Sequence, residues 1–151
     1  MEYNLRVYGL LIEEGRVLIT DELRSGTPMT KFPGGGVEAG EGLEEALIRE
    51  WQEETCTKIR VGKLLYVNPF YHKSGFFVSL PLLSVYYQVH LEEPLACELN
   101  TEKYFLPKET PGDWQQFRWL NLNDLATEEF TFVVDKALVE NIVNQYIVIQ
   151  S

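Results

Sequence analysis

The chain has few cysteines, no long apolar run and no signal-peptide pattern. Its two cysteines, Cys56 and Cys97, are too few for a disulfide framework, so two free thiols are expected. A membrane-spanning helix needs about 18 or more consecutive apolar residues, and the sequence contains no such run. These absences predict a cytoplasmic protein that has no membrane partner.

Positive charge is also scarce. The chain has 13 Lys and Arg residues against 23 Asp and Glu residues, which gives a formal net charge of −10. Because nucleic acids and anionic membranes are bound largely through Lys and Arg, this balance disfavours both as partners. A small phosphorylated ligand is compatible with the charge if metal ions supply the positive charge.

What is present fits a globular protein. The hydrophobic fraction is 45% and the aromatic fraction is 13%, and 151 residues are enough for one domain with a substantial core. No internal repeat or low-complexity tract interrupts the sequence. A single domain over residues 1–151 is therefore predicted, and the sequence leaves open whether it forms a homodimer.

One stretch, residues 32–57, combines a glycine cluster with a helical segment. Pro33 is followed by three glycines, Gly34–Gly36, and glycine allows backbone conformations and close approaches that other residues do not. A shaped loop is predicted there. Residues Leu43–Thr55 contain no glycine or proline and are rich in Leu, Ala and Glu, so they are predicted to form a helix.

Three acidic residues of this helix are predicted to share one face. Glu50, Glu53 and Glu54 fall within an arc of about 100°, and Leu43, Ala46 and Leu47 lie on the same side, whereas Glu45 and Gln52 point away. A solvated acidic face is one interpretation. The alternative is an inward cluster that needs a positive partner, since carboxylates repel one another. Arg49 or a divalent cation such as Mg²⁺ or Mn²⁺ would serve.

The spacing of these residues resembles the Nudix box, a pattern of Gly, five residues, Glu, seven residues, and then Arg-Glu-x-x-Glu-Glu. The residues that match it are Gly35, Glu41, Arg49, Glu50, Glu53 and Glu54. Trp51 stands where the pattern has an aliphatic residue, Cys56 where it has glycine, and Thr57 where it has an aliphatic residue. A positive φ at Cys56 would cost about 1–2 kcal/mol, so the helix is expected to end in another way.

The resemblance implies a function and a set of site residues. It implies a Nudix pyrophosphohydrolase that hydrolyses a diphosphate linkage in a nucleoside diphosphate derivative. Mg²⁺ or Mn²⁺ would be the cofactor. The implied metal ligands are Glu50, Glu53, Glu54 and the carbonyl of Gly34, and the implied Arg49–Glu41 pair orients this acidic cluster. A further acid from outside the box, Glu109 or Asp113, could join them, but no motif supports either residue.

Two other functions are compatible with the same resemblance. The chain could be a Nudix-like ligand-binding or sensor domain that has lost catalysis, although its acidic cluster is intact. It could also be a metal-dependent isomerase of a diphosphorylated molecule, although no Cys or His is placed for that chemistry. The substrate is open among nucleoside triphosphates, nucleotide sugars, ADP-ribose and dinucleotides.

The remaining elements follow from hydrophobic periodicity and turn signals. The predicted order gives an α/β fold, a Nudix-type α/β/α sandwich with a mixed β-sheet between helices. Predicted strands are Tyr3–Ile12, Val17–Thr20, Ile59–Tyr66, Phe76–Leu91 (bulged or split near Pro81) and Trp114–Leu120. Arg24–Thr30 and Glu92–Asp113 are predicted loops, Asn121–Leu125 a short turn, and Phe132–Tyr146 a second helix.

Four residues outside the box are candidates for binding substrate. Arg24 and Lys31 could reach a phosphate, or they could be solvated surface cations. In the aromatic segment 68–75, Tyr71 could stack on a base, with Trp114 as a weaker candidate, or these aromatics could cover the core. His72 is interpreted as an exposed loop residue.

Overall fold

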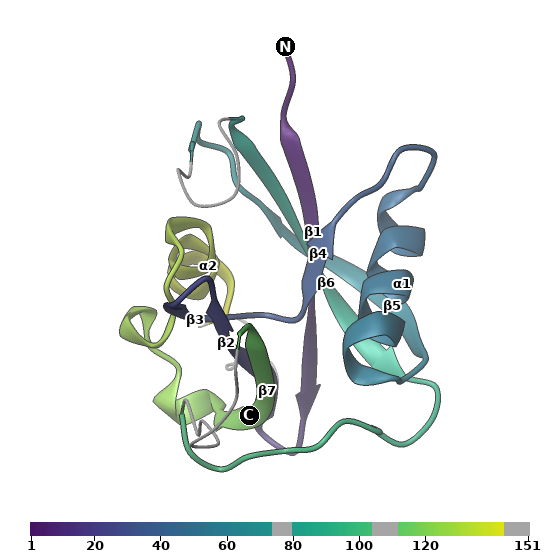
Figure 1. The fold of residues 1–151 in the computed structure, drawn as a ribbon, viewed down its shortest axis with the longest axis vertical. Helices are drawn as coiled ribbons and strands as arrows, with labels where there is room; N and C mark the ends of the chain where they lie inside the picture. The colour runs from purple at the N-terminus through teal and green to yellow at the C-terminus, as the bar shows by residue number, and fades with distance from the viewer. Residues whose placement is uncertain (74–79, 104–111, 144–151) are drawn as a thin grey trace. The chain divides into compact units, whose positions relative to one another are not determined.

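A computed structural model describes residues 1–73, 80–103 and 112–143 of the chain (Figure 1). The chain divides into two compact units. The first unit consists of Met1–Leu11 and Pro33–Ala96, and the second of Ile12–Phe32 and Cys97–Ser151. Among the described residues, no helix is both long and apolar enough to cross a lipid bilayer.

The first unit contains a mixed sheet. Strand β1 (Asn4–Glu13) runs parallel to β6 (Leu82–Leu91), and β4 (Gly34–Gly36) pairs with β1 in the antiparallel direction. Strand β5 (Ile59–Val67) pairs with β6, also antiparallel. The glycine cluster is therefore a short strand, and the prediction of a loop at Gly34–Gly36 was wrong.

Helix α1 (Leu43–Thr55) begins and ends where the sequence predicts, and it packs on β4 and β5. Its fully buried residues are Ala46, Leu47, Trp51 and Thr55. A Cβ atom at Gly9 of β1 would lie only 2.7 Å from Nε1 of Trp51. The indole thus occupies space that a side chain on β1 would otherwise fill, and this accommodates an aromatic residue at a position of the box that is usually aliphatic.

The helix ends at Cys56 in the left-handed conformation, with φ 53° and ψ 28°, and its N–H donates to the carbonyl of Gln52 over 3.0 Å. The prediction that the helix would end without a positive φ was wrong. Closing the last turn by this hydrogen bond outweighs the strain that a Cβ atom introduces. Cys56 and Cys97 are both free thiols, as predicted.

Replacing Cys56 with glycine is expected to stabilise the protein by about 1 kcal/mol, because glycine adopts this conformation without the strain caused by a Cβ atom. Urea unfolding measures the change. Cys56→Ala is the matched control, since it keeps the Cβ atom and should stay within about 0.5 kcal/mol of the parent. Equal stability of the glycine and alanine variants would contradict this account of the helix end.

The second unit contains an antiparallel sheet. Strand β2 (Arg16–Arg24) lies between β3 (Thr27–Lys31) and β7 (Trp114–Asn121), and the last residues of β1, Ile12 and Glu13, pair with the start of β2. The strand predicted at Trp114–Leu120 is confirmed, and the predicted strands Tyr3–Ile12 and Val17–Thr20 are joined in a β1–β2 hairpin. The tip of that hairpin, Glu14 and Gly15, has positive φ at both residues, which is typical of a two-residue turn.

The polar loop predicted at Arg24–Thr30 is wrong. Strand β2 continues to Arg24, and the chain turns at Ser25 and Gly26, with φ values of 49° and 78°, directly into β3. Such a pair of positive φ values matches the right-handed twist of hairpin strands. The Ser-Gly pair is the sequence signal for this turn.

Short helical segments follow β7: η1 (Leu122–Asp124), η2 (Thr127–Glu129), α2 (Val133–Leu138) and η3 (Val139–Val143). The predicted turn at Asn121–Leu125 and a second helix from Phe132 are confirmed as far as residue 143. Phe130 stacks on Phe32 with ring centroids 4.6 Å apart, so apolar contacts tie this region to the end of β3.

Two predicted segments are only partly described. Strand β6 begins at Leu82, directly after Pro81, whereas residues 76–79 of the strand predicted at Phe76–Leu91 lie outside the described residues. In Glu92–Asp113, the described residues after β6 contain one isolated bridge, Leu99 to Phe117, and no helix, as a loop would. The mixed sheet and the two helices confirm the predicted α/β class.

Candidate active site

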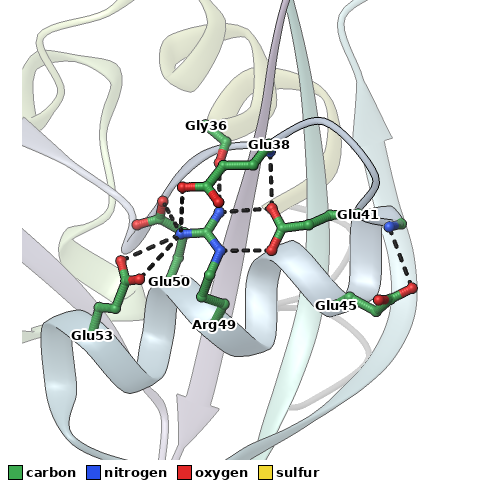
Figure 2. Close-up of polar contacts among 8 residues, drawn as sticks. Gly36, Glu38, Glu41, Glu45, Arg49, Glu50 and Glu53 are labelled. Carbon is green, nitrogen blue, oxygen red and sulfur yellow. Dashed lines mark hydrogen bonds and ion pairs between the residues drawn. The ribbon is translucent and has the colours of Figure 1, made fainter.

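A single guanidinium group organises the acidic residues of the box (Figure 2). Arg49 Nε donates to Glu41 Oε2 over 2.6 Å, and Arg49 Nη2 donates to Glu41 Oε1 over 2.9 Å. The two parallel hydrogen bonds give this ion pair the bidentate geometry that makes Arg–carboxylate contacts strong and directional. The predicted Arg49–Glu41 pair is therefore present in the structure.

The same guanidinium contacts further acceptors from the helix and from β4. Nη1 donates to Glu50 Oε1 over 3.0 Å and lies 3.3 Å from Glu53 Oε2, and Nη2 donates to the carbonyl of Gly36 over 3.0 Å. Glu38 Oε1 is 3.8 Å from Nη1. Arg49 thus partly neutralises a group of carboxylates that would otherwise repel one another.

These contacts shift the pKa values of both members of the central pair. The hydrogen bond from Arg49 and a second from the Glu38 N–H lower the pKa of Glu41. The hydrogen bond to Glu41 raises the pKa of Arg49 above its usual value, with contributions from Glu50 and Glu38. Both groups are therefore charged at neutral pH, and the pair persists across the physiological range.

Two carboxylates of α1 lie against the glycine strand β4. A Cβ atom at Gly35 would lie 2.6 Å from each carboxylate oxygen of Glu50, and Gly34 N–H donates to Glu54 Oε2 over 3.2 Å. The absence of a side chain at Gly35 is what lets Glu50 approach the strand. The structure therefore brings Glu50 and Glu54 to the glycine strand, and the role of these carboxylates and of the Gly34 carbonyl as metal ligands stays a prediction.

Glu53 departs from its predicted place. Its side chain is 58% exposed, whereas that of Glu50 is 16% exposed, so the prediction that all three carboxylates continue the buried stripe was wrong for Glu53. Glu50 lies against Gly35 of β4, whereas Glu53 contacts the guanidinium of Arg49, one turn before it on the helix, and stays largely exposed. Within the described part of the chain, no three acidic, His or Cys side chains are already gathered as a metal site.

Arg24 and Lys31 belong to the second unit and meet at a residue that sequence reasoning missed. Glu22, 1% exposed, accepts a hydrogen bond from Arg24 Nε over 2.8 Å and lies 3.3 Å from Lys31 Nζ. Lys31 is itself buried, so the alternative of a solvated surface cation was wrong for that residue. An acidic residue in the middle of β2 gave no signal of burial, because the strand was predicted to end at Thr20.

The neighbouring Asp21 is also buried and paired. Arg118 Nε donates to Asp21 Oδ2 over 2.7 Å, and Arg118 Nη2 donates to Oδ1 over 3.2 Å. Gln116 and Thr30 donate to the same carboxylate over 2.7 and 2.8 Å. A buried carboxylate with this many donors is compensated for its loss of hydration, so it serves the fold of the second unit.

The other candidate residues are placed as follows. Tyr71 is 68% exposed, and Trp114 is partly buried and pairs with Leu23 at the start of β7. Asp113 accepts the Ser25 N–H over 2.9 Å and lies 3.9 Å from Arg24. Glu109 lies outside the described residues.

Comparison with known proteins supplies the family. The family model that describes the NUDIX domain matches residues 3–140 of the sequence. The chain belongs to the Nudix family. Nudix hydrolases act on nucleoside diphosphate derivatives and generally use divalent metal ions, so this chain is a hydrolase of that class.

Solved structures of other proteins share the fold at low sequence identity. The E. coli ORF135 protein is similar with a TM-score of 0.70 and 17% identity, over 100% of this chain and 93% of that one. A MutT protein from Methanosarcina mazei Go1 is similar with a TM-score of 0.66 and 17% identity, over 95% of this chain and 94% of that one. An ADP-ribose pyrophosphatase from Streptococcus suis 89-1591 is similar with a TM-score of 0.55 and 13% identity, over 96% of this chain and 92% of that one. These similarities agree with the predicted Nudix fold.

Proposed function

We propose that this Nudix hydrolase cleaves a diphosphate linkage in a nucleoside diphosphate derivative, in a reaction that depends on Mg²⁺ or Mn²⁺. The observation that carries the proposal is the meeting of Glu50 and Glu54 with the glycine strand at Gly34 and Gly35. Oxygen-only donors of this kind suit Mg²⁺ and Mn²⁺, which bind a few carboxylates together with substrate phosphates.

The residues present fit such an ion in their chemistry. Glu50, Glu53, Glu54 and the carbonyl of Gly34 would hold it, and Arg49 supplies positive charge to the carboxylates when they are not bound to metal. When bound, a divalent ion screens the phosphoryl oxygens and lowers the pKa of the attacking water. Pairing with Glu41 fixes the guanidinium of Arg49, which in turn contacts Glu50 and Glu53. The Arg49–Glu41 pair therefore has a positioning role.

The substrate is proposed only as a class. Similar structures include a MutT protein and an ADP-ribose pyrophosphatase, and the second of these names supports ADP-ribose as one candidate within the class. We propose a small phosphorylated molecule as the partner, in a single domain over residues 1–151. Substrate contacts from Arg24, Lys31, Tyr71 and Trp114, a homodimer and a cytoplasmic location stay predictions.

A panel of nucleoside triphosphates, nucleotide sugars, dinucleotides and ADP-ribose, each assayed with Mg²⁺, Mn²⁺ or chelator, tests the proposal. At least one compound should be hydrolysed at its diphosphate linkage. Turnover should disappear after exhaustive chelation and return when Mg²⁺ or Mn²⁺ is added, because the carboxylates alone cannot screen the substrate's charge. Undiminished turnover in chelator would refute the metal mechanism. Binding of a panel compound without turnover would favour the sensor alternative.

A further inference from the structure

The glycine strand β4 separates two sets of side chains in the first unit. Its antiparallel register pairs Gly36 with Arg6, Gly35 with Val7, and Gly34 with Tyr8. Directly paired residues point to the same side of a sheet, and successive residues alternate. Because the Cβ direction of Gly35 leads to Glu50 of α1, Arg6 and Tyr8 lie on the opposite side of the strand.

Arg6 is held in place by a tyrosine on its own strand. Arg6 Nε donates to the Tyr8 hydroxyl over 2.6 Å, and its Cζ lies 5.7 Å from the centroid of the Tyr8 ring. Tyr8 is 5% exposed and stacks on Tyr86, which is fully buried, with ring centroids 5.2 Å apart. Since the ring cannot move freely, the guanidinium is positioned before any ligand arrives, which reduces the entropy that binding costs.

Gly36 leaves space beside this guanidinium. Gly34 and Gly35 are crowded, because a Cβ atom at either position would meet backbone or carboxylate atoms within 2.7 Å. At Gly36, by contrast, Arg6 Nη1 at 3.8 Å is the one atom of the described residues that would lie within 4 Å of such a Cβ atom. Crowding by described residues therefore does not account for glycine at position 36, and the strand presents bare backbone next to Arg6.

A diphosphate needs positive charge on more than one side. In the proposed reaction the α1 carboxylates and their metal meet it on one side of β4, and the guanidinium of Arg49 lies among Glu41, Glu50 and Glu53. The chain carries a net charge of −10, so a cation placed beside the glycine strand matters for binding an anion. A guanidinium offers the planar fork that matches phosphoryl oxygens.

We propose that Arg6 binds the diphosphate oxygens of the substrate at the edge of β4, on the side opposite Glu50, and that Tyr8 is its positioning residue. This inference rests on the proposed function. The alternative is that the Arg6–Tyr8 contact has only a structural role in the sheet. In that case, loss of the contact would change the stability of the protein and not its affinity for substrate.

The test compares Arg6→Gln, Arg6→Lys and Tyr8→Phe with the parent, with Arg60→Gln as the control. Arg60 is a 60% exposed arginine on β5, outside the proposed site. Two quantities are measured in Mg²⁺: KM and kcat for the hydrolysed panel compound, and the Kd of its non-hydrolysable methylene-bridged analogue by calorimetry. Melting temperatures check the fold of each variant.

Arg6→Gln should raise KM and the analogue Kd at least about 10-fold, as expected for loss of a hydrogen bond to a charged group, with kcat changed less than about 3-fold. Arg6→Lys should recover part of that loss, Tyr8→Phe should give a smaller increase, and Arg60→Gln should match the parent. Unchanged KM and Kd in a folded Arg6→Gln variant would overturn the inference. If Arg6→Gln does not fold, Arg6→Lys decides, and parental affinity in that variant would overturn it.

Failure of this inference is distinct from failure of the proposed function. A parent protein that hydrolyses no panel compound refutes the hydrolase reaction and, with it, the substrate to which Arg6 would bind. A parent that hydrolyses its substrate with a KM that is insensitive to Arg6 refutes only the inference.

Discussion

Replacing Glu54 with glutamine is expected to lower kcat by at least about 10²-fold, the lower end for a positioned catalytic group. Glutamine keeps the size of the side chain and an oxygen that can accept the Gly34 N–H, which Glu54 Oε2 accepts over 3.2 Å. What it removes is the negative charge needed to hold a divalent ion. The melting temperature in chelator should therefore stay within about 2 °C of the parent, because the packing is unchanged.

Glu53→Gln should lower kcat in the same way, and Glu44→Gln is the matched control. Glu44 is an exposed residue of the first helical turn, whereas the carboxylate of Glu45 accepts the Gly42 N–H over 3.3 Å and is a poorer control. Steady-state kinetics and melts in chelator are measured for all three variants. Full activity together with much lower melting temperatures for Glu53→Gln and Glu54→Gln would mean that the cluster is a structural ion-pair network.

Alanine substitutions at the adjacent residues Gly34 and Gly35 should have different effects, the first on stability and the second on activity. At Gly34 a Cβ atom would overlap the carbonyl oxygen of Val7 and lie 2.7 Å from the Cα of Tyr8, and backbone atoms of a central strand cannot move aside. Gly34→Ala should therefore cost about 3 kcal/mol, the upper end for overpacking, and lower the melting temperature by roughly 10 °C.

Gly35→Ala should instead remove activity from a protein that still folds. The three atoms nearest to its Cβ atom would be those of the Glu50 carboxylate, with each oxygen at 2.6 Å, and that flexible side chain can rotate away. We expect a melting temperature within a few degrees of the parent and a kcat reduced at least about 10-fold, since a small displacement of a positioned group is costly. Parental kcat in Gly35→Ala would show that the place of Glu50 against β4 has no role in catalysis.

Much of the first unit could be predicted because local sequence determines it. Helix α1 has the predicted bounds, since Leu43–Thr55 contains good helix formers and Gly42 precedes it. The pairing of Arg49 with Glu41 was implied by the resemblance to the Nudix box, and the structure contains it. Which carboxylates face solvent depends on packing against β4, which Glu50 contacts at Gly35, and the arc calculated for an isolated helix contains no information about that strand.

Other features depend on contacts between distant segments. Gly34–Gly36 has the composition of a loop, and only pairing with β1 makes it a strand. The same pairing brings Arg6 to the glycine strand, so Arg6 gave no signal in the sequence beyond its alternation with Tyr8. Lys31 is buried because it meets Glu22 across two paired strands, and a local pattern contains no information about that contact.

Binding of Mn²⁺ to the substrate-free protein tests the central claim most directly, because it asks whether the carboxylates of α1 hold a divalent ion. Titration followed by the electron paramagnetic resonance signal of free Mn²⁺ gives the affinity without relying on turnover. The account predicts that the parent and Glu44→Gln bind Mn²⁺ alike, and that Glu54→Gln binds it at least about 10-fold more weakly, as expected when a ligand is lost. Equal binding by the parent and Glu54→Gln, or no binding by the parent, would contradict it.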